Sequence, residues 1–125
     1  MHILDSSCWL EYFLDGKGAD RYAPGIEGHG EIIVPVIVLH EVFKVVMRAS
    51  NEDSALAATA ALQQFPVIPV DENIAMYSAK LGQEHSLAMA DSMIFATAHI
   101  HHATLWTQDA DFRNLPGVKY FEKAC

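Results

Sequence analysis

Four carboxylates occur where the surrounding residues are apolar or where a helix cap would be expected. They are Asp5, Glu41, Asp91 and Asp109. Held close together, such groups would raise one another's pKa and take up protons, but a divalent cation removes that objection. Carboxylate oxygens suit Mg²⁺ or Mn²⁺, and such an ion lowers the pKa of a bound water and orients it for attack on phosphorus. If the fold gathers these residues, they predict metal-dependent phosphodiester chemistry.

Each of these acids also has an ordinary structural interpretation. Asp5 and Asp109 follow apolar runs, where aspartate is common at strand ends and helix caps. Asp91 would interact favourably with a helix dipole in a first turn. Glu41 lies within VIVLHEVFKVV, where Lys44 could pair with it on an exposed stripe. The sequence leaves these interpretations open for each acid taken singly.

Short β-branched runs alternate with helical patterns along most of the chain. The runs are HIL, EIIV, FPVIPV, ATLWT and GVKYF, and the clearest helical patterns cover residues 36–49, 52–64, 72–86 and 88–102. Helix-compatible stretches separate all of the runs except the last two. This alternation predicts an α/β fold with a mainly parallel sheet of about five strands. The glycine-rich segment 15–31 is predicted to be a loop with a helical turn.

Segment 36–49 has a high β propensity but a helical pattern. Its polar residues form one stripe at helical spacing: His40, Glu41, Lys44 and Arg48. Pro35 suits the first position of this helix. Because the rest of its surface is apolar, we expect burial by the sheet and by a second subunit.

The expected topology would bring the acids together. In an open α/β sheet, ligands bind beyond the carboxyl ends of the strands, where the winding direction reverses. If the first and fourth strands flank that point, Asp5 and Asp109 both line it. Glu41 and Asp91, each near the start of a helix, would approach from either side.

Length and composition narrow the class of protein. With 125 residues, 51% of them hydrophobic, residues 1–125 are expected to form one domain. A net charge of −8 argues against binding nucleic acid through a broad basic face, although an acidic metal site adds to the negative count. No apolar window suits a membrane span or secretion signal, and Cys8 and Cys125 form no disulfide framework or metal motif. We expect a cytoplasmic protein with no membrane association.

Three segments carry a resemblance to a known family. They are LDSSCWLEYF, VPVIVLHEVFKVV and MADSMIFATAHIHHATLWTQDADFRNLPGV, which occur in the family's order over nearly the whole chain. Together they resemble PIN-domain proteins of the VapC-like toxin group, including the family's T-x-D-x-DF-x-x-LPG ending. One departure is LAMAD, where many relatives have a glycine-containing turn before the aspartate.

The resemblance implies a three-layer α/β/α sandwich and an endoribonuclease that depends on Mg²⁺ or Mn²⁺. It also implies a homodimer and a cognate antitoxin whose tail enters the acidic groove. Position by position, Asp5, Glu41, Asp91 and Asp109 match the family's acidic quartet, and Asp111 is a further candidate.

Several neighbours have chemistry that would suit an RNA nuclease. Ser6, Ser7 and Thr107 are candidates to orient a metal-bound water or phosphate. The structural alternative is a helix cap for the two serines and an ordinary strand position for Thr107. The candidate contacts to the RNA backbone are Lys44, Arg48 and Arg113, whose alternative role is a solvated surface.

Other functions remain compatible with such a fold. A receiver-like phosphoacceptor domain would use Asp71, but Asp5 lacks a paired acid and TLWTQD supplies no lysine. A non-catalytic PIN-like module that binds RNA or a partner would not need all four carboxylates. His99 and His102 have a helical spacing but lack the further ligands of a zinc site.

Overall fold

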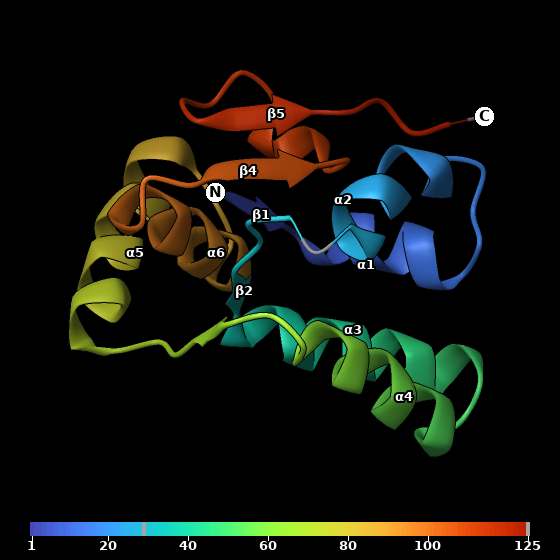
Figure 1. Ribbon diagram of the computed structural model, residues 1–125. Helices are drawn as coiled ribbons and strands as arrows, with labels where there is room; N and C mark the ends of the chain where they lie inside the picture. Colours follow the sequence, from blue (N-terminus) through green and yellow to red (C-terminus); the bar gives the residue numbers. More distant parts are fainter. Residues whose placement is uncertain (29, 125) are drawn as a thin grey trace.

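The computed structural model describes residues 1–28 and 30–124 (Figure 1). The predicted absence of a disulfide involves Cys125, which lies outside the described residues. Cys8 is buried and forms no disulfide within the described part of the chain, and its thiol donates to the Trp106 carbonyl oxygen at 3.4 Å. Within the described ranges, no helix is both long enough and apolar enough to cross a bilayer.

The helices and strands follow the predicted order, with short additional elements. In chain order they are β1 (His2–Leu4), α1 (Ser6–Phe13), the 3₁₀ helix η1 (Ala19–Arg21), α2 (Ala23–Glu27), β2 (Val34–Pro35), α3 (Val36–Ala49), α4 (Glu52–Leu62), β3 (Val67–Ile68), α5 (Glu72–His85), α6 (Met89–Ile100), β4 (Thr104–Thr107), the 3₁₀ helix η2 (Ala110–Phe112) and β5 (Val118–Tyr120). The segment predicted as a loop with a helical turn contains η1 and α2, anchored by the buried Tyr22 and Ile26.

The strands pair in parallel throughout. One sheet has the order β1-β4-β5, a second consists of β2 and β3, and a parallel bridge between His2 and Ile32 joins them. The resulting order is β3-β2-β1-β4-β5, flanked by helices (Figure 1). The predicted α/β fold with five mainly parallel strands is therefore confirmed. The winding direction reverses between β1 and β4, so the crevice expected at a reversal lies at their carboxyl ends.

Proline shortens the two strands of the smaller sheet. Expected strands EIIV and FPVIPV reduce to the pairs Val34–Val67 and Pro35–Ile68. Proline cannot donate to a β ladder, which limits pairing around Pro35 and Pro66. Pro35 is extended and serves as the N-cap of α3, so its predicted placement at the first helical position is wrong by one residue.

Helix α3 begins and ends where its polar stripe predicts. Its buried positions, Val38, Val42 and Val46, repeat every four residues and form the opposite stripe. The helix contacts α1, α4 and α6, so much of its apolar surface is covered within the chain. Burial by a second subunit stays a prediction.

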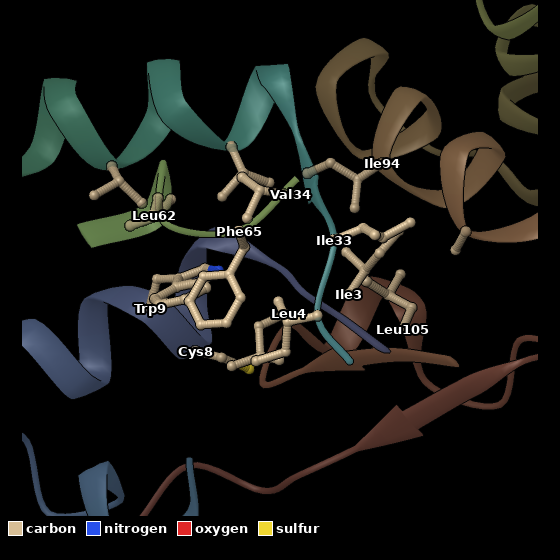
Figure 2. Packing of buried hydrophobic residues seen from close by; sticks show 14 of the residues in the cluster. Ile3, Leu4, Cys8, Trp9, Ile33, Val34, Leu62, Phe65, Ile94 and Leu105 are labelled. Carbon is tan, nitrogen blue, oxygen red and sulfur yellow. The ribbon is translucent and has the colours of Figure 1, made fainter. Parts of the chain in front are cut away.

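The core lies between the sheet and these helices (Figure 2). Ile3 and Leu105 are in register on adjacent strands, and both are fully buried. Trp9 of α1 packs against Phe65, with ring centroids 5.9 Å apart. This contact packs α1 against the segment that leads into β3, and α1 is joined to β1 by Asp5, where the candidate site begins.

Candidate metal centre

Asp5 connects β1 to α1 and acts as the N-cap of the helix. Its Oδ1 accepts hydrogen bonds from the backbone N–H groups of Ser7 (3.0 Å) and Cys8 (3.4 Å), and from the Ser7 hydroxyl. Its Oδ2 accepts a hydrogen bond from the Thr107 hydroxyl at 2.6 Å. Asp5 is 3% exposed. The capping interpretation is therefore confirmed, and it does not exclude a site role because the same carboxyl faces the end of β4.

Two hydroxyl groups tie the end of β1 to the end of β4. The buried Thr107 hydroxyl donates to Asp5 and accepts the Asp109 backbone N–H at 2.9 Å. The Ser7 hydroxyl donates to Asp5 and accepts the Gln108 backbone N–H at 3.1 Å. Of the two serines that the sequence offers as accessory residues, Ser6 and Ser7, it is Ser7 whose hydroxyl contacts Asp5.

Three aspartates approach closely enough to share an ion. One carboxylate oxygen each from Asp91, Asp109 and Asp111 lies within 4.8 Å of the other two. Asp91 is in the first turn of α6, and Asp109 is the N-cap of η2. The Asp109 Oδ1 accepts the Asp111 backbone N–H at 2.9 Å, so the short helix η2 fixes the two relative to each other. Asp111 thus belongs to the cluster.

Burial and like charge raise the pKa of two of these acids. Burial is the main cause that raises the pKa of Asp5 to about 6, partly opposed by its hydrogen bonds from Ser7, Thr107 and Cys8. Burial also raises the pKa of Asp91 to about 6. Four negative charges add to the shift of Asp91, in decreasing order Asp109, Glu41, Asp5 and Asp111. The five carboxyl groups therefore form one electrostatic cluster.

Glu41 approaches the cluster from α3. Its side chain is half-buried, and its Oε1 is buried without a hydrogen-bond partner among the described residues. The alternative interpretation, an ion pair with Lys44, is not formed within the described ranges. A buried carboxylate oxygen without a partner is costly unless another group satisfies it.

These donors fit a hard divalent cation. All of them are carboxylate oxygens with no cation paired to them within the described residues, and the Glu41 Oε1 has no hydrogen-bond partner there. Ligands on opposite sides of Mg²⁺ lie about 4 Å apart, a separation that falls within the 4.8 Å limit met by one oxygen each of Asp91, Asp109 and Asp111. Asp5 is outside this triad and is fully engaged by protein donors, so it contributes to the cluster through its charge and by fixing the end of β4.

The three basic residues predicted to contact RNA differ in whether they interact with other side chains of the chain. Lys44 and Arg48 are exposed on α3 and form no ion pair within the described part of the chain. Arg113 pairs with Glu122 at 3.3 Å and lies 5.1 Å from the ring centroid of Tyr120. Arg113 is therefore already engaged by its own chain.

The other sequence candidates lie outside the cluster. Asp71 caps α5 through a 2.8 Å hydrogen bond from the Ile74 N–H and follows β3 at the edge of the sheet. The His99 ring packs tilted against Phe95, with ring centroids 4.3 Å apart, and contacts the Pro116 carbonyl oxygen at 3.2 Å. In the described ranges, the aspartate triad is the only group of three or more acidic, histidine or cysteine side chains that meets the spacing for one ion.

The fold of this chain is similar to that of chains in solved structures of toxins and toxin–antitoxin complexes. A toxin–antitoxin complex from Klebsiella pneumoniae contains a chain 26% identical to this one, with a TM-score of 0.82 and coverage of 98% of this chain and 99% of that chain. VapC20 from Mycobacterium tuberculosis, described as a sarcin-ricin loop cleaving toxin, is 18% identical, with a TM-score of 0.75 and coverage of 90% and 92%. FitAcB from Neisseria gonorrhoeae is 22% identical, with a TM-score of 0.71 and coverage of 98% and 97%.

Sequence comparison gives the family. None of the curated proteins matches the chain. The PIN domain family matches residues 2–118, a range that includes all five clustered carboxylates. This chain belongs to the PIN domain family.

Proposed function

We propose that this chain is an endoribonuclease that depends on Mg²⁺ or Mn²⁺ and acts as the toxin of a toxin–antitoxin pair. The supporting observation is the convergence of carboxylates from four separate segments at the carboxyl ends of β1 and β4. Such a cluster disfavours the metal-free fold, so its presence argues for a bound cation. Family membership and the similarity to a chain of a toxin–antitoxin complex support this proposal.

Asp91, Asp109 and Asp111 would hold the ion, with Asp5 and Glu41 completing the acidic environment. A bound Mg²⁺ or Mn²⁺ supplies Lewis acidity that activates water and neutralises charge on the phosphate in the transition state. Thr107 orients Asp5 and the backbone of Asp109 through its two hydrogen bonds. Glu41 Oε1, which has no partner among the described residues, is available to accept a hydrogen bond from the attacking water.

The substrate and partners follow from the same proposal. Lys44 and Arg48 are exposed and would contact RNA phosphates. Arg113 is paired with Glu122 and lies over the Tyr120 ring, so its role would be to position Tyr120. The cognate antitoxin is a second protein that covers the acidic groove, and the active form is a homodimer in the cytoplasm.

Cleavage by the purified, antitoxin-free protein tests the proposal. RNA is incubated with Mg²⁺, Mn²⁺ or EDTA and wild type, Asp91→Asn or the control Asp20→Asn, which changes an exposed acid in η1. We expect cleavage with either metal by wild type and the control, and none in EDTA or with Asp91→Asn. Equal cleavage in EDTA, or full activity of Asp91→Asn, would contradict the metal mechanism.

A further inference from the structure

A tyrosine occupies the next position along the edge that carries the carboxylates. Strands β1, β4 and β5 are parallel neighbours, so their carboxyl ends lie at one edge of the sheet. Asp5 follows β1 and Asp109 follows β4, while Tyr120 ends β5 and is in register with Thr107. Because residues in register point to the same face, Tyr120 lies beside the metal centre on the side away from β1.

A groove connects this tyrosine to the carboxylates. The main part has a volume of about 530 Å³ and is lined by Ser7, Gln108, Asp109, Ala110, Tyr120 and Lys123. A second part of about 230 Å³ shares Ser7, Gln108 and Lys123 with it and extends towards Leu10 and Leu14. We call the two parts together the β5 groove. The main part falls within the usual range for small-ligand sites, and Asp109 places it directly against the metal centre.

Tyr120 provides an aromatic surface beside the carboxylates. The Arg113 guanidinium lies over one face of its ring, 5.1 Å from the centroid, and forms an exposed ion pair with Glu122 at 3.3 Å. The other face of the ring is suited to stack a nucleobase, because every base has a π face.

Two polar groups complete the β5 groove. Lys123 lines both parts, is exposed, and forms no ion pair among the described residues. Gln108 is 3% exposed, and its Nε2 donates to the Ser7 carbonyl oxygen at 3.4 Å. Its buried Oε1 has no partner in the described part of the chain, so an amino group on a base could satisfy it. A nearby acid, Glu11, is already used by the Gly18 backbone N–H at 2.9 Å.

We propose that the β5 groove binds one unstacked nucleotide of the RNA beside the scissile phosphate, with its base on Tyr120 and a phosphate at Lys123. This inference rests on the proposed nuclease function and assigns it a subsite beside the metal centre. A base can reach Tyr120 only if it leaves its stack, so the groove takes an unpaired nucleotide.

RNA binding tests the groove without relying on cleavage. Fluorescence anisotropy measures the affinity of a short labelled single-stranded RNA, and of the same strand in a duplex, in Mg²⁺ with Asp91→Asn as the parent. Adding Tyr120→Leu should weaken single-strand binding on the order of ten-fold, and Tyr120→Phe should bind like the parent. Adding Lys123→Gln should weaken binding and reduce the salt dependence by about 0.7 in log–log slope. Duplex binding should not respond to Tyr120→Leu.

Lys119→Gln is the matched control for charge. Lys119 is also on β5, but its ammonium lies 4.5 Å from the ring centroid of Trp106, on the opposite face of the sheet from Tyr120. Unchanged binding by Tyr120→Leu and Lys123→Gln, or an equal loss with Lys119→Gln, would overturn the groove assignment. Lys123 is exposed, so its variant remains informative if Tyr120→Leu fails to fold.

The two proposals can fail separately. Wild-type cleavage together with unchanged binding in both groove variants removes the β5 groove and leaves the nuclease. Absence of wild-type cleavage in Mg²⁺ and Mn²⁺, with the variant effects on binding intact, removes the nuclease and leaves a single-strand RNA site.

Discussion

Replacing Asp91 with Asn is expected to stabilise the metal-free protein at neutral pH while it abolishes cleavage. Asp91 is half-buried among four other carboxylates, and its pKa is raised from 3.8 to about 6. In the absence of an ion, its negative charge is therefore less stable in the folded chain than in the unfolded chain. Asparagine keeps the size of the side chain and removes that charge.

The size and sign of the effect follow from the pKa. A shift of about 2 units corresponds to about 3 kcal/mol, which solvent screening of a half-buried group reduces to about 1–2 kcal/mol. For a chain of this length, such a gain raises Tm by about 4–8 °C. Because the folded-state pKa of Asp91 is raised, wild type has its full stability below the unfolded pKa of 3.8 and loses it as the pH rises through about 6. The gain from Asp91→Asn should therefore be absent near pH 4 and complete above pH 7.

Thermal unfolding in EDTA across this pH range measures the effect. Asp20→Asn, which changes an exposed acid in η1, controls for the loss of one negative charge from the whole chain. A lower Tm for Asp91→Asn at pH 7.5, or a gain that is the same at pH 4 and pH 7.5, would refute the electrostatic reasoning. So would an equal gain from Asp20→Asn.

Three further predictions concern the same cluster. Mg²⁺ or Mn²⁺ should raise the Tm of wild type more at pH 7.5 than at pH 5, because Asp5 and Asp91 become protonated below about pH 6; an equal rise at both pH values would contradict this. Glu41→Gln should lower the cleavage rate about 10- to 100-fold in a gel assay. Its Tm in EDTA should be no lower than that of wild type, because the Glu41 Oε1 has no hydrogen bond to lose among the described residues. Thr107→Val should lower the free energy of unfolding by about 1–3 kcal/mol in urea titrations, because it leaves the Asp5 Oδ2 and the Asp109 N–H unpaired. Thr107→Ser should recover most of this loss, and equal stability of the Val and Ser variants would show that the hydroxyl is not needed.

Local sequence patterns predicted most of the fold because they reflect burial. The polar stripe in segment 36–49 gave both ends of α3 despite its high β propensity, since the spacing of buried valines decides which structure forms. The predicted strands at β2 and β3 are longer than the observed ones, because proline interrupts the β-branched runs that predict them. Pairing between strands depends on which N–H groups are available, and a hydropathy pattern does not contain that information.

The sequence indicated which acidic residues could form the candidate site, but it did not indicate how close together their side chains lie. The alternation predicts a parallel sheet, but the adjacency of the first and fourth strands was only a condition of the sequence argument. The observed strand order places Asp5 and Asp109 together. The closeness of Asp111 depends on η2, a single 3₁₀ turn that sequence patterns do not resolve. The unpaired oxygen of Gln108 depends on side-chain direction, for which one sequence gives no signal.

Asp5 shows why a capping role and a site role are compatible at one residue. A helix N-terminus favours negative charge through its free N–H groups, and those of Ser7 and Cys8 donate to the Asp5 Oδ1, together with the Ser7 hydroxyl. Burial nevertheless raises its pKa to about 6, so these bonds offset only part of the cost of the charge. A capping aspartate on a solvated helix would not have its pKa raised by burial. The Asp5 charge is destabilised because Thr107 and the end of β4 enclose the carboxyl group, and a cation beside Asp109 would offset this cost.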